Sequence, residues 1–217
     1  MVRLFCFLIG YFVGMISSSY IVGKINGIDI RQHGSGNLGA TNTMRALGKK
    51  AGLTVMFLDF AKIILIVLLV RILFGSAMPD DRFLIQTYAL LGCIFGHDFP
   101  FYLKFRGGKG CACLAGYIIF FHPIQAIALT IIFILVFLVT HYVSLCTMVL
   151  YATFLISVII FGQLGQLEIT TERLLEVYII YAVLFIVTIL KHRSNIKRIV
   201  NGNENKTYLK KKKTAVN

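Results

Sequence analysis

Three separate segments of this chain combine basic side chains with glycine, hydroxyl and amide groups, a mixture suited to binding phosphate. The first reads Gly34-Ser35-Gly36-Asn37-Leu38-Gly39-Ala40-Thr41-Asn42 and is followed by Arg45. Glycine allows backbone N–H groups to converge on an anion, and the hydroxyl and amide side chains add further donors. Arginine supplies a planar pair of donors that matches a phosphate group. A polar turn between two helices is the alternative interpretation of this segment.

The second segment runs from Gly96 to Gly110 and contains His97, Lys104 and the run Gly107-Gly108-Lys109-Gly110. An apolar stretch follows at once, so the glycine-lysine run stands where a helix begins. The free N–H groups and the dipole of a helix start both favour an anion. The run is not a nucleotide-binding P-loop, because Gly110 stands where that motif needs Ser or Thr for Mg²⁺. The segment therefore predicts phosphate binding without nucleotide hydrolysis.

The third segment reads His192-Arg193-Ser194-Asn195-Ile196-Lys197-Arg198, with Gly202 and Glu204 after it. On a helix, His192 and Asn195 are three residues apart and share a face, so together they could hold a polar group of a substrate. An ordinary basic end of a membrane helix would also explain this composition. His141 and Ser144 lie at a further turn, from which they could reach the same site.

One ionisable pair lies inside an apolar stretch. Asp59 and Lys62 are three residues apart, and charged groups within a membrane are costly and usually paired. We favour a structural ion pair over a functional one. The five cysteines show no C-x-x-C spacing and no disulfide framework, so we interpret them as buried small apolar side chains.

We expect membrane helices to hold these three segments in place. The chain is 58% hydrophobic and only 14% charged, with a mean hydropathy of +0.81, whereas soluble domains carry about 25% charged residues. The net charge of +13 favours anionic lipid or phosphorylated substrates as partners. Nucleic acid is not expected, because no basic module interleaved with aromatic residues is present.

Seven apolar blocks alternate with the polar segments. They are Leu4–Val22, Leu53–Phe74, Phe83–Phe95, Cys111–Phe121, Ile124–His141, Val143–Phe161 and Leu174–Leu190. Lysine and arginine gather after the first, third and seventh blocks, and the positive-inside rule places such segments in the cytoplasm. This alternation predicts an all-α integral membrane protein of seven transmembrane helices, the third and fourth short, with the N-terminus outside and the C-terminus cytoplasmic.

Two other organisations conflict with the charge pattern. A signal peptide cleaved near Ser17-Ser18-Ser19 would export the first basic loop, and merging the fourth and fifth blocks would export the lysine-rich C-terminus. We therefore expect one membrane-embedded domain over residues 1–200. Residues 201–217, with Lys210–Lys213, are expected to be a disordered, basic cytoplasmic tail.

With these segments in view, the chain resembles the bacterial acyl-phosphate:glycerol-3-phosphate acyltransferase family. The matching residues are Ser35–Asn42 with Arg45–Gly48, Gly96–Pro100 with Gly107–Gly110, Thr140–Leu145, and His192–Ile196. The resemblance implies a seven-helix enzyme of the bacterial inner membrane, with its active site facing the cytoplasm. It also implies transfer of an acyl chain from acyl phosphate to the 1-hydroxyl of glycerol 3-phosphate. The products would be lysophosphatidic acid and inorganic phosphate, with no metal and no cofactor.

The resemblance also suggests roles for the residues of the polar segments. The catalytic set is Ser35, Arg45, His97, Lys104, Ser144, His192 and Asn195, and the substrate-binding set is Asn37, Gly39, Thr41, Asn42, Gly107, Gly108, Lys109 and Gly110. Within these sets, we expect Arg45, Lys104, His192 and Asn195 to hold glycerol 3-phosphate. The first loop and the Gly107–Gly110 run would hold acyl phosphate. The proton of the attacking hydroxyl would pass to His97 or to the substrate's own phosphate.

The sequence departs from the family pattern at a few positions. Leu38 replaces a usual proline, His141 a frequent arginine, and Cys111-Ala112-Cys113 a Val-Ala-Thr run. The H-x-x-x-x-D pattern of acyl-CoA-dependent acyltransferases is absent, because no aspartate stands five residues after any of the five histidines. A transporter for a phosphorylated metabolite is the alternative class, but it should carry polar groups near the bilayer midplane. Here they crowd the ends of the apolar blocks.

Overall fold

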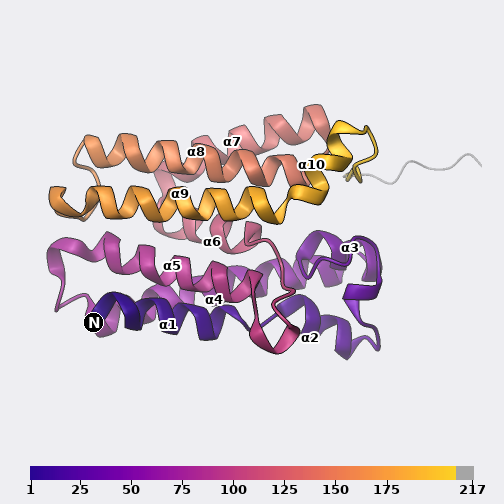
Figure 1. Cartoon of the computed structure of the whole chain (residues 1–217), viewed down its shortest axis with the longest axis horizontal. Coiled ribbons are helices and arrows are strands. Elements are labelled where there is room, and N and C mark those ends of the chain that lie inside the picture. The colour runs from indigo at the N-terminus through magenta and orange to yellow at the C-terminus, as the bar shows by residue number, and fades with distance from the viewer. Residues whose placement is uncertain (209–217) are drawn as a thin grey trace, which may run out of the picture.

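The computed structural model describes residues 1–208, and in these residues it contains helices and no strand (Figure 1). The α-helices are α1 (Val2–Gly14), α2 (Ser18–Ile25), α3 (Ala40–Leu47), α4 (Lys49–Phe74), α5 (Arg82–Asp98), α6 (Cys111–Phe121), α7 (Pro123–Thr140), α8 (Val143–Gln163), α9 (Leu174–Lys191) and α10 (Arg193–Val200). Four 3₁₀ turns join them: η1 (Ile30–Gln32), η2 (Pro79–Asp81), η3 (Phe101–Leu103) and η4 (Thr171–Arg173). The all-helical class expected from the sequence is confirmed for these residues.

Each of the seven apolar blocks is largely helical, although the first is divided between α1 and α2. Five segments are long and apolar enough to cross a membrane, namely Val2–Ile25, Lys49–Phe74, Pro123–Thr140, Val143–Gln163 and Thr171–Lys191. The third and fourth blocks form the shorter helices α5, of 17 residues, and α6, of 11 residues. Large apolar side chains such as Phe57, Leu65 and Ile127 face outward, as expected for surfaces in contact with lipid tails.

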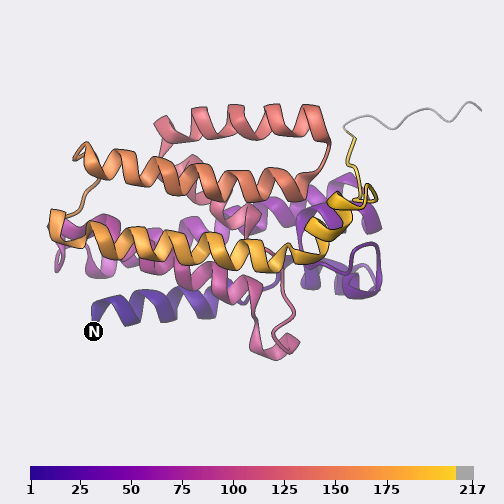
Figure 2. The same cartoon turned by 45° about the horizontal axis from the view of Figure 1, so that its top comes forward.

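The three basic segments gather at one end of the bundle. In Figure 1, α2, α3 and α10 lie together at the right, and the N-terminus lies at the opposite end. The turned view of Figure 2 keeps the same arrangement, with the loop before α6 at the same end. Helix direction explains this, because α1, α5, α7 and α9 all run toward that end. Segments distant in the sequence therefore come together there.

Helices α1 and α5 approach very closely through glycine. Gly10 and Gly14 lie one turn apart on α1, and Gly92 and Gly96 do so on α5. A Cβ atom added to any of these four glycines would lie 2.0–2.3 Å from a backbone carbonyl oxygen of the other helix. Such spacing of small residues lets membrane helices pack backbone to backbone. The contact fixes the end of α5, and thus His97, relative to α1.

The first apolar block is divided by a break between α1 and α2. The Lys62 ammonium of α4 donates hydrogen bonds to the carbonyls of Gly14 and Ile16, both at 3.3 Å. The Ser17 hydroxyl accepts a hydrogen bond from the Tyr20 N–H at 3.4 Å and caps α2. These contacts satisfy backbone groups that the break leaves free. Lys62 therefore has a structural role at the break.

The buried core lies between α4, α5, α6, α8 and α9. Its largest fully buried side chains include Leu84 and Leu90 of α5, Leu114 and Tyr117 of α6, and Phe154 of α8. Helix α6 packs against α4, α5 and α7, and these neighbours accommodate an apolar helix of only 11 residues. Its N-terminal end is thereby held beside the polar end of the bundle.

Candidate active site

A cavity of about 360 Å³ opens where the three basic segments meet. Its polar side chains include Ser35, Asn37, Thr41, Asn42, Arg45, Asp59, His97, Lys109, Ser144, His192, Asn195 and Glu204. Its other wall is apolar and is formed by α4, α6, α7 and α8, with residues that include Met56, Phe60, Ala115, Ile118, Leu129, Phe133 and Leu150. The cavity can therefore take a ligand with an anionic head and an apolar chain.

The first basic loop is shaped by Asn42, which is buried. The Asn42 side-chain oxygen accepts a hydrogen bond from the Ser35 N–H at 2.9 Å, and its amide donates to the His33 carbonyl at 2.9 Å. Both ends of this amide are engaged with the loop itself. Asn42 thus holds Ser35, Asn37 and the start of α3 at the cavity wall, instead of offering a free donor to a ligand.

The glycines of the second basic loop pack against the end of α5. The N–H groups of Gly107 and Gly108 donate to the carbonyls of Asp98 and His97, at 3.1 and 3.0 Å. A Cβ atom would lie 2.1 Å from the His97 carbonyl oxygen at Gly107 and 2.0 Å from His97 Nε2 at Gly108. These two glycines therefore allow close approach of the backbone, and their N–H groups are already used.

Gly110 and Lys109 complete this loop. Gly110 adopts φ 65°, in the left-handed region that favours glycine, and caps the N-terminus of α6. A Cβ atom there would lie 2.5 Å from the Tyr151 hydroxyl. The loop contributes the Lys109 ammonium to the cavity, and this ammonium donates a hydrogen bond to the Asn195 side-chain oxygen.

The third segment presents His192 and Asn195 on the same wall, as their spacing predicts. His192 Nδ1 lies 2.8 Å from the Thr188 carbonyl oxygen, which can only accept, so this nitrogen carries a proton. In the neutral ring, Nε2 then remains as an acceptor. Burial, together with the nearby positive charge of Lys109, lowers the pKa of His192 to about 4. The ring is therefore neutral at neutral pH.

Glu204 is the site residue to which the sequence assigned no role. Its Oε1 accepts hydrogen bonds from the Ser144 hydroxyl at 2.8 Å and the Asn195 amide at 2.6 Å, and Oε2 pairs with Arg198 Nε at 2.7 Å. Burial alone would raise the pKa of Glu204, but the bonds from Asn195, Arg198 and Ser144 outweigh it and lower the pKa. One signal was available: Glu204 is the one carboxylate in a strongly basic stretch.

The segment after α10 contacts the exposed side chain of Arg45. Arg45 Nη2 donates to the Thr207 hydroxyl at 3.0 Å and to the Asn205 carbonyl at 3.4 Å. The Thr207 N–H donates to the His141 carbonyl at 2.9 Å. Residues 201–208, which the sequence assigns to the tail, thus lie against the bundle. Lys210–Lys213 lie outside the described residues.

Lys104 does not join the other residues at the cavity. It follows η3 in the left-handed conformation with φ 55°, and its side chain is exposed outside the cavity wall. Its assignment to glycerol 3-phosphate therefore stays a prediction that would need a movement of the loop. The other members of the catalytic set, Ser35, Arg45, His97, Ser144, His192 and Asn195, all line the cavity.

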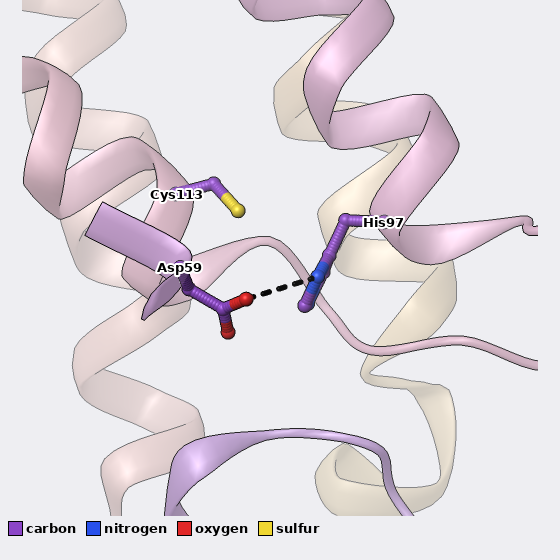
Figure 3. A group of neighbouring side chains, drawn as sticks. All are labelled: Asp59, His97 and Cys113. Carbon is purple, nitrogen blue, oxygen red and sulfur yellow. Dashed lines mark ion pairs between the residues drawn. The ribbon is translucent and has the colours of Figure 1, made fainter. Parts of the chain in front are cut away.

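Asp59, His97 and Cys113 form a buried group whose ligand atoms lie within 4.8 Å of one another (Figure 3). The Lys62 ammonium lies 2.9 Å from both Asp59 Oδ1 and His97 Nδ1, so a cation already stands between the carboxylate and the imidazole. The Ser18 hydroxyl adds a donor to Asp59 at 2.9 Å. The ion pair expected for Asp59 and Lys62 is confirmed, and we interpret the group as a buried ion-pair cluster.

The protonation of Lys109 is sensitive to its surroundings. Burial first, and then the positive charge of Arg198, lower the pKa of Lys109 to about 8, although Glu204 acts in the opposite direction. Burial also lowers the pKa of Arg45. An anion bound among these cations would relieve both effects, because it favours their charged forms. These cations therefore favour binding of an anion, such as a phosphate group, at the polar end of the cavity.

Comparison with known proteins gives one consistent family. The family model described as "Glycerol-3-phosphate acyltransferase" matches residues 4–202. A glycerol-3-phosphate acyltransferase of Bacillus cereus (strain G9842) is 40% identical over 207 residues, covering 95% of this chain and 96% of the relative. A relative of the same name from Finegoldia magna is 38% identical over 197 residues, covering 90% of this chain and 91% of the relative.

Solved structures agree with the sequence relatives. The crystal structure of PlsY, an integral membrane glycerol 3-phosphate acyltransferase, in its glycerol 3-phosphate form is similar with a TM-score of 0.78 and 30% identity. That match covers 95% of this chain and 96% of the other. The lysophosphatidic acid form of PlsY is similar with a TM-score of 0.76 and 30% identity, and 95% of each chain is covered. Together with the apolar helices, these likenesses make this chain a multi-pass membrane protein.

Proposed function

The chain belongs to the glycerol-3-phosphate acyltransferase family, and we propose that it transfers an acyl chain from acyl phosphate to the 1-hydroxyl of glycerol 3-phosphate. The products are lysophosphatidic acid and inorganic phosphate. One observation supports this proposal most directly: a single cavity joins a polar end that holds Arg45 and Lys109 to an apolar wall. A lipid donor with a phosphate head and a small phosphorylated acceptor both fit such a cavity.

The reaction needs little covalent participation by the protein. In acyl phosphate the carbonyl carbon is already activated, and phosphate is a good leaving group. The 1-hydroxyl oxygen attacks this carbon, the carbon–oxygen bond to phosphate breaks, and phosphate leaves with the electron pair. The proton of the hydroxyl is released at the same time. The protein must mainly hold two mutually repelling anions in contact and exclude water. The cationic side chains at the cavity offset the repulsion between the two anions.

We assign the binding of the two substrates as follows. The phosphate of the donor lies among Ser35, Thr41, the start of α3 and Lys109, where a helix N-terminus and a cation converge. The acceptor lies by Arg45, His192 and Asn195. The neutral His192 ring offers Nε2 as a hydrogen-bond acceptor, which suits a hydroxyl group better than a phosphate. Its role is therefore to orient the glycerol hydroxyl.

Hydrogen bonding around His97 bears on the fate of the proton. Lysine ammonium has donors only, so Lys62 must donate to His97 Nδ1 at 2.9 Å. In a neutral ring, His97 Nε2 then carries the proton and cannot accept another. The proton of the attacking hydroxyl therefore passes to the substrate's own phosphate, and not to His97, the other acceptor considered from the sequence.

We propose seven membrane crossings in the bacterial inner membrane, with the N-terminus outside and the three basic segments in the cytoplasm. In this topology α5 and α6 are the short third and fourth crossings. The gathering of the basic segments at one end of the bundle supports this topology. A cytoplasmic active site gives access to phosphorylated metabolites, while the apolar cavity wall faces the bilayer.

The choice of acyl donor tests this proposal. Purified protein in detergent should acylate glycerol 3-phosphate with palmitoyl phosphate, but not with palmitoyl-CoA or palmitoyl-acyl carrier protein. Detergent removes the two compartments that a transporter needs, so turnover there also separates an acyltransferase from a transporter. Efficient turnover with palmitoyl-CoA would contradict acyl phosphate as the specific acyl donor.

A further inference from the structure

A second cavity, of about 890 Å³, opens at the same end of the bundle, and we call it the basic vestibule. The cationic side chains that line it are Arg31, Arg106, Lys109, Lys191, Arg193 and Arg198. They come from three separate parts of the chain: the first basic loop, the second basic loop, and the junction of α9 with α10. This cavity thus collects cations from the second and third basic segments and from Arg31, which lies just before the first.

The positive charge of the vestibule is only partly neutralised. Arg31 pairs with Asp29 at 2.6 Å, and Arg198 pairs with Glu204 at 2.7 Å. By contrast, within residues 1–208 no ion pair joins Arg106, Lys109 or Arg193 to a carboxylate. An excess of positive charge therefore remains on a concave surface, where low-dielectric walls concentrate the field.

The vestibule adjoins the reaction cavity. Ser35, Asn37 and Lys109 line both of them. These residues belong to the wall to which we assign the phosphate of the acyl donor, so a small anion that leaves this wall reaches the vestibule directly. The two cavities differ in their other walls. The reaction cavity continues between apolar helix faces. The vestibule is lined mainly by charged and polar residues, with Phe99, Phe105, Val187 and Leu190 as its apolar members.

The two proposed substrates need different routes. Acyl phosphate carries a chain that stays in the bilayer and can enter along the apolar wall. Glycerol 3-phosphate and orthophosphate carry charge and no apolar chain, and moving such anions through hydrocarbon costs several kcal/mol or more. A basic cleft open to water attracts them and raises their rate of arrival by roughly 10- to 1,000-fold.

We propose that the basic vestibule is the route by which glycerol 3-phosphate enters the reaction cavity and orthophosphate leaves it. Arg106 and Arg193 attract these anions without taking part in the chemical step. This inference rests on the proposed function, which identifies the two anions, but the positive potential of the vestibule can be measured without any turnover.

The kinetic test removes both charges in the double variant Arg106→Gln, Arg193→Gln. At low ionic strength, kcat/KM for glycerol 3-phosphate should fall about tenfold, whereas KM for palmitoyl phosphate should stay unchanged. The loss should shrink at about 0.5 M salt, because charges are then screened within a few Å. The matched control is Lys49→Gln, Lys50→Gln, which removes two exposed charges at the same end but outside both cavities.

The second test reads the potential of the vestibule directly. A single cysteine replaces Ser194, which lines the vestibule, in a cysteine-free background. An anionic thiol reagent should label it faster than a cationic reagent of the same size, and millimolar orthophosphate should slow the anionic reagent. Both differences should disappear when Arg106 and Arg193 are also changed to Gln.

The outcomes separate the two proposals. A wild-type protein without acyltransfer activity contradicts the proposed function, and labelling that favours the anionic reagent still supports an anion-attracting vestibule. Normal acyltransfer with equal labelling by both reagents overturns the vestibule alone. The vestibule is also overturned if kcat/KM for glycerol 3-phosphate is unchanged in the double variant, or if it falls equally in the Lys49, Lys50 control.

Discussion

The Lys109 ammonium donates a hydrogen bond to the side-chain oxygen of Asn195, and so joins the second basic segment to the third. The hydrogen bonds extend from Asn195 to Glu204, which accepts from both the Asn195 amide and the Ser144 hydroxyl. Four polar side chains from separate parts of the chain thus form one connected network at the cavity. Such a network holds its members in place only while each has its hydrogen-bonding partners. Removal of one of the four side chains should therefore disturb the positions of the other three.

The first prediction concerns Arg45. Arg45→Lys should lower kcat/KM for glycerol 3-phosphate about tenfold to a hundredfold, the equivalent of one charge-assisted hydrogen bond of about 1.5–3 kcal/mol. An ammonium keeps the charge but loses the paired, coplanar donors of the guanidinium. Steady-state kinetics on the purified protein measure this effect. Arg173→Lys makes the same exchange at the opposite end of the bundle and should have no effect. Equal kinetics in wild type and Arg45→Lys would remove Arg45 from the site.

The second prediction follows from the pKa of Lys109, which burial lowers to about 8. We propose that the charged form of Lys109 binds the phosphate of the donor, so KM for palmitoyl phosphate should be constant well below pH 8 and should rise as the pH passes through this pKa. Above the pKa the rise approaches about tenfold per pH unit, since each unit removes nine-tenths of the remaining charged form. In Lys109→Arg the charge persists and the rise should be absent. A profile that is unchanged in this variant would assign the titration to another group.

The third prediction concerns the contact between α1 and α5. Gly96→Ala should lower the stability by about 1–3 kcal/mol, because the new Cβ meets the Tyr11 carbonyl oxygen at 2.1 Å. The direction is informative, since alanine in place of a glycine inside a helix normally stabilises it by about 1 kcal/mol. Thermal unfolding in detergent measures the change. Ala128→Val adds side-chain atoms on an exposed face of α7 and should be nearly neutral. A Gly96→Ala protein that is as stable as wild type would exclude this close packing.

The fourth prediction tests the proposed topology. Single cysteines replace Lys49 at the start of α4, Arg106 in the loop before α6 and Lys206 in the segment after α10, and all three positions are exposed. In a cysteine-free background, an impermeant thiol reagent added to intact cells should label none of them, and it should label all three after the membrane is made permeable. Labelling of any one from outside the cell would contradict seven crossings.

Most of the membrane helices, and the shared end of the three basic segments, can be predicted from the sequence. Block length and apolar composition predict where α4, α7, α8 and α9 lie, because a helix is the simplest way to satisfy backbone groups in lipid. Charge placement predicts that the three basic segments share one end, and the periodicity of a helix predicts that His192 and Asn195 share a face. These features are local, so they can be read along the chain.

The hydrogen-bonding partners of each polar group depend on how the helices and loops pack together. Asn42, Gly107 and Gly108 look like free phosphate donors in the sequence, yet their hydrogen-bonding groups are used within the loops. Glu204 gains its place only because the segment after α10 folds back and brings it to Ser144 and Asn195. This is because the role of a polar side chain depends on the groups with which it forms hydrogen bonds. In this protein those partners come from segments more than 40 residues apart in several cases, as with Lys62 and Gly14. Their proximity depends on helix packing, which local pattern does not encode.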